Sequence, residues 1–158
     1  MLHPISPTYD SRSRILILGS FPSVKSREIG YFYGHPQNRF WKVLAAIFNN
    51  ECPNTIEEKR NFLLSNKIAV WDVIASCDIE GSSDSSIKNV VANDLSKILE
   101  SAKITRIFTN GKKADSLYKK FTEEKTGIKA TCLPSTSPAN AAWSFERLLE
   151  AWQVIKEE

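Results

Sequence analysis

The stretch that decides the fold is Ile15-Leu16-Ile17-Leu18, followed by Gly19-Ser20-Phe21-Pro22-Ser23. An unbroken run of leucine and β-branched residues indicates a strand that is buried on both faces. Proteins with alternating strands and helices bind ligands at the carboxyl ends of such strands, so residues 19–23 are expected to border a pocket. These five residues include no carboxylate.

Three more apolar runs, at residues 68–71, 104–109 and 128–133, are predicted strands. Helical patterns lie between them at residues 40–48, from Thr55 through Leu64, at 93–102 and at 112–125. A last helix is predicted from Ser137 as its cap, with Pro138 in the first helical position, to Ile155. This alternation predicts an α/β fold with a parallel sheet covered on both faces and joined by right-handed crossovers. One domain, residues 1–158, accommodates the whole chain.

Residues 76–86 are rich in serine, aspartate and glycine, and they follow a predicted strand. They are too few to separate two domains. We therefore expect a loop at the same edge of the sheet as Gly19.

Composition excludes several classes of function. Lysine and arginine number 21 against 18 acidic residues, and this net charge of +3 permits a polyanionic partner without identifying one. Cys52, Cys77 and Cys132 have no metal-ligand spacing and are too few for an iron–sulfur cluster, so neither a metal nor another cofactor is expected. The first residues resemble neither a signal peptide nor a membrane span, so we expect a cytoplasmic protein with no membrane partner.

Three segments together resemble a known family. They are the Gly19-Ser20-Phe21-Pro22 turn, the Tyr33-Gly34-His35-Pro36-Gln37-Asn38-Arg39-Phe40-Trp41 run, and Leu133-Pro134-Ser135-Thr136-Ser137-Pro138-Ala139-Asn140-Ala141 after the last strand. The chain resembles the uracil-DNA glycosylase superfamily over residues 14–152, and it is most similar to the hypoxanthine-DNA glycosylases, also called DNA-deoxyinosine glycosylases. Residues 35–41 also resemble the mismatch-specific uracil/thymine enzymes. The resemblance implies a three-layer α/β/α sandwich with a four-stranded parallel sheet.

Enzymes of this family flip a damaged nucleotide out of DNA and cut its N-glycosidic bond, which leaves an abasic site. Most members have Asp, Asn or Ala where this chain has Phe21, and His or Asn where it has Leu133. The hypoxanthine enzymes show the same two departures. The resemblance to them implies that Asn38 is the catalytic polar residue.

The resemblance also implies the other site residues. Tyr33 matches the aromatic that stacks on the flipped base. The predicted base pocket comprises Gly19, Ser20, Phe21, Tyr33, His35 and Leu133. The predicted DNA-binding residues are Pro22, Ser23, Arg39, Pro134, Ser135, Thr136, Ser137, Pro138 and Asn140.

Each assignment has a simpler structural alternative. Asn38 is also placed to cap the helix at residues 40–48. Phe21 and Tyr33 could be core aromatics, and His35 could make a structural hydrogen bond in its loop. Asp72 and Asp84 are the remaining acids near the loops, but neither matches a catalytic position of the family.

These observations favour a monofunctional DNA glycosylase of base excision repair, acting as a monomer on DNA with deaminated bases, hypoxanthine first and uracil second. An alternative is a catalytically inactive relative that binds damaged nucleic acid, because Phe21 and Leu133 replace two polar residues. A domain that binds free nucleotides is disfavoured, because the chain has no glycine-rich phosphate loop.

Overall fold

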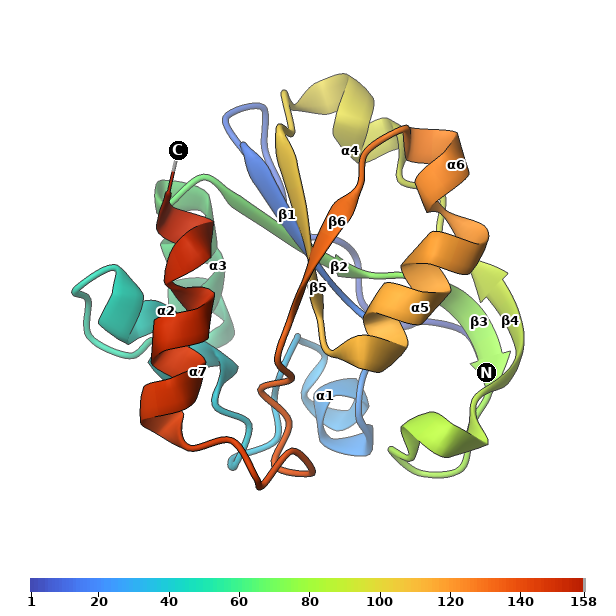
Figure 1. The fold of residues 1–158 in the computed structure, drawn as a ribbon, viewed down its shortest axis with the longest axis horizontal. Helices are drawn as coiled ribbons and strands as arrows, with labels where there is room; N and C mark the ends of the chain where they lie inside the picture. Colours follow the sequence, from blue (N-terminus) through green and yellow to red (C-terminus); the bar gives the residue numbers. More distant parts are fainter. Residues whose placement is uncertain (158) are drawn as a thin grey trace.

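Four parallel strands form the centre of the molecule in the computed structural model, which describes residues 1–157 (Figure 1). The strands are β1 (Ile15–Gly19), β2 (Ile68–Asp72), β5 (Arg106–Asn110) and β6 (Ala130–Leu133), in the spatial order β2-β1-β5-β6. All three pairings are parallel, which confirms the predicted sheet. Because β1 lies between β2 and β5, its last residue, Gly19, is flanked by the ends of both neighbours.

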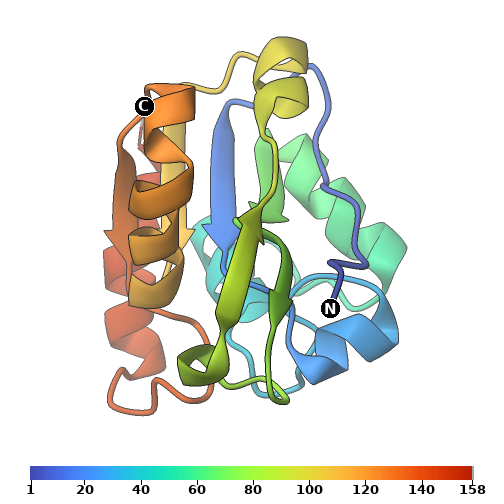
Figure 2. The same cartoon turned by 90° about the vertical axis from the view of Figure 1, so that its right-hand side faces the viewer.

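Helices cover both faces of this sheet and complete the predicted three layers (Figures 1 and 2). One face carries α2 (Phe40–Ile47), α3 (Ile56–Ser65) and α7 (Phe145–Trp152), and the other carries α4 (Ser96–Ser101), α5 (Lys112–Phe121) and α6 (Glu123–Thr126). Ile15 and Ile17 enter the first core, whereas Leu16 and Leu18 enter the second. Successive side chains of a strand point to opposite faces, so an unbroken apolar run fills two cores.

A two-stranded hairpin was not predicted. Its strands, β3 (Ile74–Asp78) and β4 (Lys88–Ala92), pair antiparallel with two register irregularities, and the short turn η1 (Asp84–Ser86) lies between them. The polar residues around η1 extend to the carboxyl edge of the main sheet, where the sequence placed them (Figure 2).

The amino-terminal segment runs antiparallel along the outer edge of β2. Thr8 and Val70 exchange two backbone hydrogen bonds, and Leu2 forms a bridge further on with Ser76 of β3. An uncovered edge strand is open to pairing with other chains, and this segment covers β2. It also brings His3 to the end of β2.

Two predicted helix boundaries were wrong. The last helix begins at Phe145, where Ser144 accepts a hydrogen bond from the Arg147 amide, and not at Ser137. The backbone carbonyls of residues 137, 140 and 143 instead accept hydrogen bonds from Arg39, which holds this stretch as a loop. The helix predicted at residues 112–125 is interrupted at Thr122, whose φ is −128°.

The remaining helices agree more closely with the sequence. Thr55 and Glu58 form a complete capping box at the start of α3. A six-residue helix, α1 (Val24–Ile29), lies inside the stretch that the sequence left as a loop. The chain ends in a short 3₁₀ turn, η2 (Gln153–Lys156). Within residues 1–157, no helix combines the length and apolar character that crossing a bilayer requires.

Trp152 connects the core to the loop that follows β6. Its side chain is fully buried, it meets Phe40 edge to face at 5.9 Å, and its indole N–H donates to the Pro134 carbonyl over 2.9 Å. The position of residues 134–137 therefore depends on α7.

Replacing Trp152 with phenylalanine keeps a buried ring but leaves the Pro134 carbonyl without its donor. We expect the free energy of unfolding to fall by about 1–3 kcal/mol, measured by urea denaturation. Trp143→Phe is the matched control, because Trp143 is only half-buried and its indole N–H makes no hydrogen bond with residues 1–157. Equal losses in the two variants would contradict the role given to the Trp152 hydrogen bond.

Candidate active site

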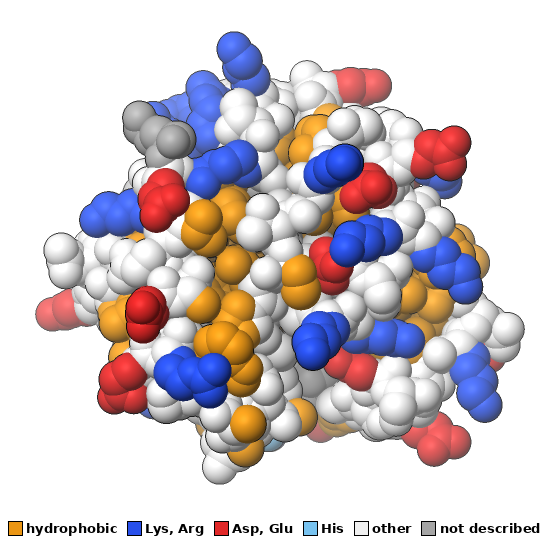
Figure 3. Space-filling view, viewed as in Figure 1, with side chains coloured by type: hydrophobic (Ala, Val, Ile, Leu, Met, Phe, Trp, Pro, Cys, Tyr) orange, Lys and Arg blue, Asp and Glu red, His pale blue; other side chains and the backbone are white. Residues whose placement is uncertain are grey.

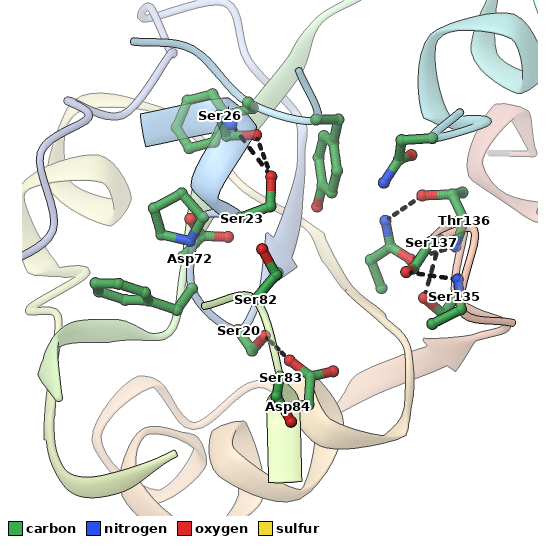
Figure 4. Close-up of a pocket in the computed structure, with 18 of the residues that line it drawn as sticks. Ser20, Ser23, Ser26, Asp72, Ser82, Ser83, Asp84, Ser135, Thr136 and Ser137 are labelled. Atoms are coloured by element: carbon green, nitrogen blue, oxygen red, sulfur yellow. Dashed lines mark hydrogen bonds between the residues drawn. The ribbon is translucent and has the colours of Figure 1, made fainter. Parts of the chain in front are cut away.

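A cavity of about 350 Å³ opens at the carboxyl edge of the sheet, which is where the sequence predicted a pocket. Loops from distant parts of the chain form its walls, as Figure 4 shows for the serines after β1, the serines of residues 82–83 and those after β6. Its volume is in the range of small-ligand pockets. Most of the polar lining consists of hydroxyl groups, with Asp72 and Asp84 as its carboxylates.

The cavity brings together most of the residues that the sequence singled out. Those that line it are Gly19, Ser20, Phe21, Pro22, Ser23, Tyr33, Asn38, Ser135, Thr136 and Ser137. His35, Arg39, Leu133, Pro134, Pro138 and Asn140 are not part of its lining. Leu133, Pro134 and Asn140 border a second cavity of about 660 Å³ beside it, together with Lys112 and Lys113.

Tyr33 is held rigidly at the cavity wall. Its ring stacks on Phe40 with a centroid separation of 4.0 Å and an interplanar angle of 19°, so one face is covered. Its φ of 52° lies in the left-handed region, where residues other than glycine are uncommon and often functional. Its hydroxyl is buried without a hydrogen-bond partner among residues 1–157. Burial, and secondarily the charge of Asp72, raises the pKa of Tyr33 far above its ordinary value, while the nearby Asn110 side chain acts in the opposite direction, so the phenol keeps its proton.

Asn38 stands just before α2 and contacts its first residue. Its side-chain carbonyl accepts a hydrogen bond of 2.9 Å from the Phe40 amide. The N-cap residue of α2 is Arg39, so the prediction that Asn38 caps this helix was wrong by one residue. Its Nδ2 makes no hydrogen bond with the described residues, although the side chain lines the cavity. The bond to the Phe40 amide therefore fixes the Asn38 side chain and leaves its Nδ2 available as a donor to a ligand.

Two predicted pocket residues have other surroundings. His35 accepts a hydrogen bond from the Gln37 amide over 3.1 Å, which is the structural alternative that the sequence left open. Leu133 is 4% exposed and belongs to the core between the sheet and α7. Phe21 does line the cavity, but its ring is also part of the opposite core, where it meets His3 edge-on at 5.6 Å.

The serine loops retain free donors. Ser135 accepts a hydrogen bond from the Ser137 amide, and Ser137 accepts one from the Ala139 amide. A hydroxyl can donate while it accepts, and neither of these hydroxyls donates to another described residue. Ser23 differs, because it caps α1 and donates to Ser26. The loop after β6 is thus the better provided with hydroxyl donors for an anionic ligand.

Arg39 holds one wall of the cavity in place. Its guanidinium donates to the carbonyls of Ser137 at 3.3 Å and Asn140 at 3.1 Å, and also to that of Trp143. The Arg39 amide in turn donates to the Thr136 carbonyl. These bonds favour a positioning role for Arg39 over the phosphate contact that the sequence predicted.

Sequence reasoning missed Asn110 as a site residue. It ends β5 and lines the cavity, where its amide nitrogen donates to Thr136 Oγ1 at 3.0 Å and its carbonyl accepts from the Thr136 amide at 3.1 Å. Each group has hydrogen-bonding capacity left for a ligand. The signal was available, because Asn110 follows a predicted strand and parallel strands end at one edge of the sheet.

Asp72 and Asp84, which match no catalytic position of the family, also line the cavity. Asp72 ends β2, is 4% exposed and bonds His3 across 2.7 Å. Asp84 lies on the serine-rich loop, where burial raises the pKa of its carboxyl, while a hydrogen bond from Ser20 and the charge of Lys113 act in the opposite direction. His3 lies 69 residues from Asp72, and Ser20 lies 64 residues from Asp84. No local sequence pattern could therefore reveal either contact.

On the face that Figure 3 shows, charged side chains do not gather in a single patch. Figure 3 shows lysine and arginine side chains interspersed with acidic ones on the face that carries α5, α7 and β6. Lys112 and Lys113 are the basic residues that border the second cavity. Among residues 1–157, no group of three or more His, Cys, Asp or Glu side chains is arranged to hold a metal ion.

Comparison with known proteins gives consistent results. The family model of the uracil DNA glycosylase superfamily matches residues 6–156. A protein of Methanosarcina acetivorans named hypoxanthine DNA glycosylase is 37% identical over 148 residues, which cover 92% of each chain. A protein of the same name from Methanosarcina barkeri is 36% identical over 110 residues, covering 68% of this chain and 70% of that one.

The fold has a counterpart among solved structures. A solution NMR structure from Methanosarcina acetivorans, of a protein provisionally named uracil DNA glycosylase, superposes with a TM-score of 0.81. The two sequences are 31% identical, and the match covers 99% of this chain and all of the other.

Gly19 is required at the cavity floor because no side chain fits there. A Cβ at this position would lie 2.4 Å from Asp72 Oδ1 and 3.0 Å from the Tyr33 hydroxyl oxygen. Gly19→Ala is therefore expected to lower the free energy of unfolding by about 1–3 kcal/mol in chemical denaturation. In the control Gly34→Ala, the nearest atom is the flexible end of Ile29 at 3.0 Å, so a smaller loss is expected. If Gly19→Ala unfolded with the same free energy as the wild type, the inferred steric crowding at residue 19 would be contradicted.

Proposed function

This chain belongs to the uracil-DNA glycosylase superfamily, and we propose that it excises hypoxanthine from DNA as a monofunctional glycosylase. The observation that carries the proposal is the cavity, which combines a fixed aromatic ring, an unused amide donor and hydroxyl-lined walls. Both named relatives carry the activity in their names, which supports hypoxanthine as the first substrate and leaves uracil second.

The reaction begins with extrusion of the damaged nucleotide from the duplex. Unstacking costs a few kcal/mol and is least costly for a mispaired base, which contributes selectivity. The flipped base enters the cavity and packs along the free face of Tyr33, whose other face rests on Phe40. A preformed aromatic wall of this kind stabilises any flat base by stacking, so further groups have to supply the choice of base.

Asn38 and Asn110 supply those groups. As the glycosidic bond breaks, negative charge develops on the departing purine, over its ring nitrogens and its carbonyl oxygen. The free Nδ2 of Asn38 donates to an acceptor on that edge, and its orientation is fixed in advance by the bond to the Phe40 amide. Preorganised donors of this type stabilise a developing anion strongly because they need no rearrangement. Asn110, held by Thr136, reads a second edge of the base.

The serine loops hold the DNA backbone. Hydroxyl and loop amide groups bind phosphate oxygens without reading sequence, and the Ser135 and Ser137 hydroxyls are free to donate. The lysines beside the second cavity extend this contact along the strand. Every group in the scheme belongs to one chain, so we propose that the protein acts as a monomer.

A cleavage assay tests the proposed function. A duplex with a single deoxyinosine is incubated with excess protein and then treated with hot alkali, which breaks the strand at an abasic site. We expect cleavage at deoxyinosine and weaker cleavage at deoxyuridine. Binding to the deoxyinosine duplex with no abasic product would instead support the alternative, a catalytically inactive relative, to which the replacement of two polar residues by Phe21 and Leu133 points.

Asn38→Asp separates the proposed catalytic role of Asn38 from its structural bond to the Phe40 amide. Aspartate retains the carboxyl oxygen that accepts from the Phe40 amide, so the stability of the fold is expected to change little. It lacks the amide donor and adds negative charge where the base anion forms. We expect the single-turnover rate on deoxyinosine to fall at least about 100-fold. Wild-type cleavage by a folded Asn38→Asp protein would remove Asn38 from the catalytic machinery.

A further inference from the structure

The carboxylate that is missing after β1 is supplied by the neighbouring strand. Asp72 is the last residue of β2 and stands opposite Gly19 in the parallel register. It is 4% exposed, lines the cavity, and points toward the serine-lined interior in Figure 4. A carboxylate this deeply buried is costly unless it is paired, so its partner needs explanation.

That partner is His3, and the hydrogen bonds identify its protonation state. His3 Nδ1 accepts from the Ile5 amide at 3.1 Å, so this nitrogen carries no proton. The ring proton is therefore on Nε2, which donates to Asp72 Oδ2 over 2.7 Å. The imidazole is itself buried, with its side chain 3% exposed, and it meets Phe21 and Trp71 edge-on. Asp72 is consequently fixed as the acceptor, with one oxygen committed to His3.

The other carboxylate oxygen faces an unpaired donor. Asp72 Oδ1 and the Tyr33 hydroxyl both approach the space above Gly19, at 2.4 Å and 3.0 Å from the point where a Cβ would lie. Neither atom has a hydrogen-bond partner among residues 1–157. The Tyr33 phenol keeps its proton because burial raises its pKa, so it can donate where Asp72 accepts. One small oxygen ligand placed between them satisfies both groups.

We propose that this ligand is the water that attacks the sugar, that Asp72 is the catalytic base, and that His3 is the positioning residue that holds Asp72. The inference rests on the proposed function. Phe21 at the usual carboxylate position then forms an apolar floor against which the His3 ring packs. In this scheme the catalytic carboxylate stands at the end of β2 instead of the end of β1.

The step balances without any further reactant. The bond between C1′ and N9 breaks, and its electron pair leaves with the base while an oxocarbenium ion forms on the sugar. The water oxygen forms a bond to C1′ and gives one proton to Asp72 Oδ1, from which the proton passes to solvent. The purine anion takes one proton from solvent. The products are hypoxanthine and an abasic sugar.

Asp84 does not meet the same requirements. It also lines the cavity, and its carboxyl is partly desolvated there, but the residue as a whole is exposed on the serine-rich loop. Its Oδ1 accepts a hydrogen bond from Ser20 at 3.3 Å. No residue holds it as His3 holds Asp72. Asp72 alone among the acids of this cavity is both buried and fixed in orientation.

The test is Asp72→Asn, which keeps an oxygen acceptor for His3 and removes the base. We expect the single-turnover rate on deoxyinosine duplex to fall at least about 100-fold. Affinity for a duplex with an uncleavable tetrahydrofuran abasic site should stay within about threefold of the wild type, because the substitution mainly removes proton transfer. Asp115→Asn is the matched control, since Asp115 is also buried, at 8% exposure, but lies outside both cavities.

Three further variants keep the test decisive if Asp72→Asn folds poorly. His3→Gln offers an amide N–H to Asp72 and should restore most of the rate that His3→Ala loses, whereas equal rates in the two would contradict a positioning role. Tyr33→Phe keeps the ring and removes only the hydroxyl, so we expect about a tenfold lower rate with unchanged duplex affinity.

The outcomes separate the two proposals. A wild-type protein that releases neither hypoxanthine nor uracil overturns the proposed function, and the inference falls with it. A wild-type protein that cleaves deoxyinosine, beside a folded Asp72→Asn variant that does so at an equal rate, overturns only the role of Asp72.

Discussion

The parallel pairing of β1 with β2 is the constraint on which the site depends. It places Gly19 opposite Asp72, and the absence of a side chain at residue 19 lets the carboxylate and the Tyr33 hydroxyl approach one small space. The pairing in turn depends on apolar residues that fill a core on each side of β1. Packing of the sheet therefore places Asp72 beside Gly19, which lies more than fifty residues away in sequence.

The site divides its work among the ends of different strands. The loop that leads from β1 into α2 provides the ring of Tyr33 and the amide of Asn38, β2 provides Asp72, and β5 provides Asn110. In our proposal, the Asn38 amide stabilises the negative charge of the departing base, while the Asp72 carboxylate accepts a proton from the attacking water. A hydrogen-bond donor and a base are thus provided by different elements of the fold. This arrangement accounts for Phe21, which has no polar role to fill.

Periodicity predicted the four sheet strands and most helices because burial on one or two faces leaves a local pattern in the sequence. The hairpin of β3 and β4 left no such pattern, since its pairing is irregular and most of its residues are only partly buried or exposed. The start of α7 was misplaced because Arg39, about a hundred residues away, binds the carbonyls that a helix at Ser137 would have used. The bond between His3 and Asp72 was likewise out of reach, since it joins residues 69 apart in the chain.

The central claim is that the flipped base enters the cavity above Gly19. It is tested most directly by a crystal structure with a duplex that carries hypoxanthine on an uncleavable 2′-fluoroarabinosyl sugar. We predict that the base lies along the Tyr33 ring with Asn38 Nδ2 within hydrogen-bond distance of its edge, and that a water joins Asp72 Oδ1 to the Tyr33 hydroxyl. A base that remains stacked in the duplex, or that enters the second cavity beside Lys112 and Lys113, would contradict the account.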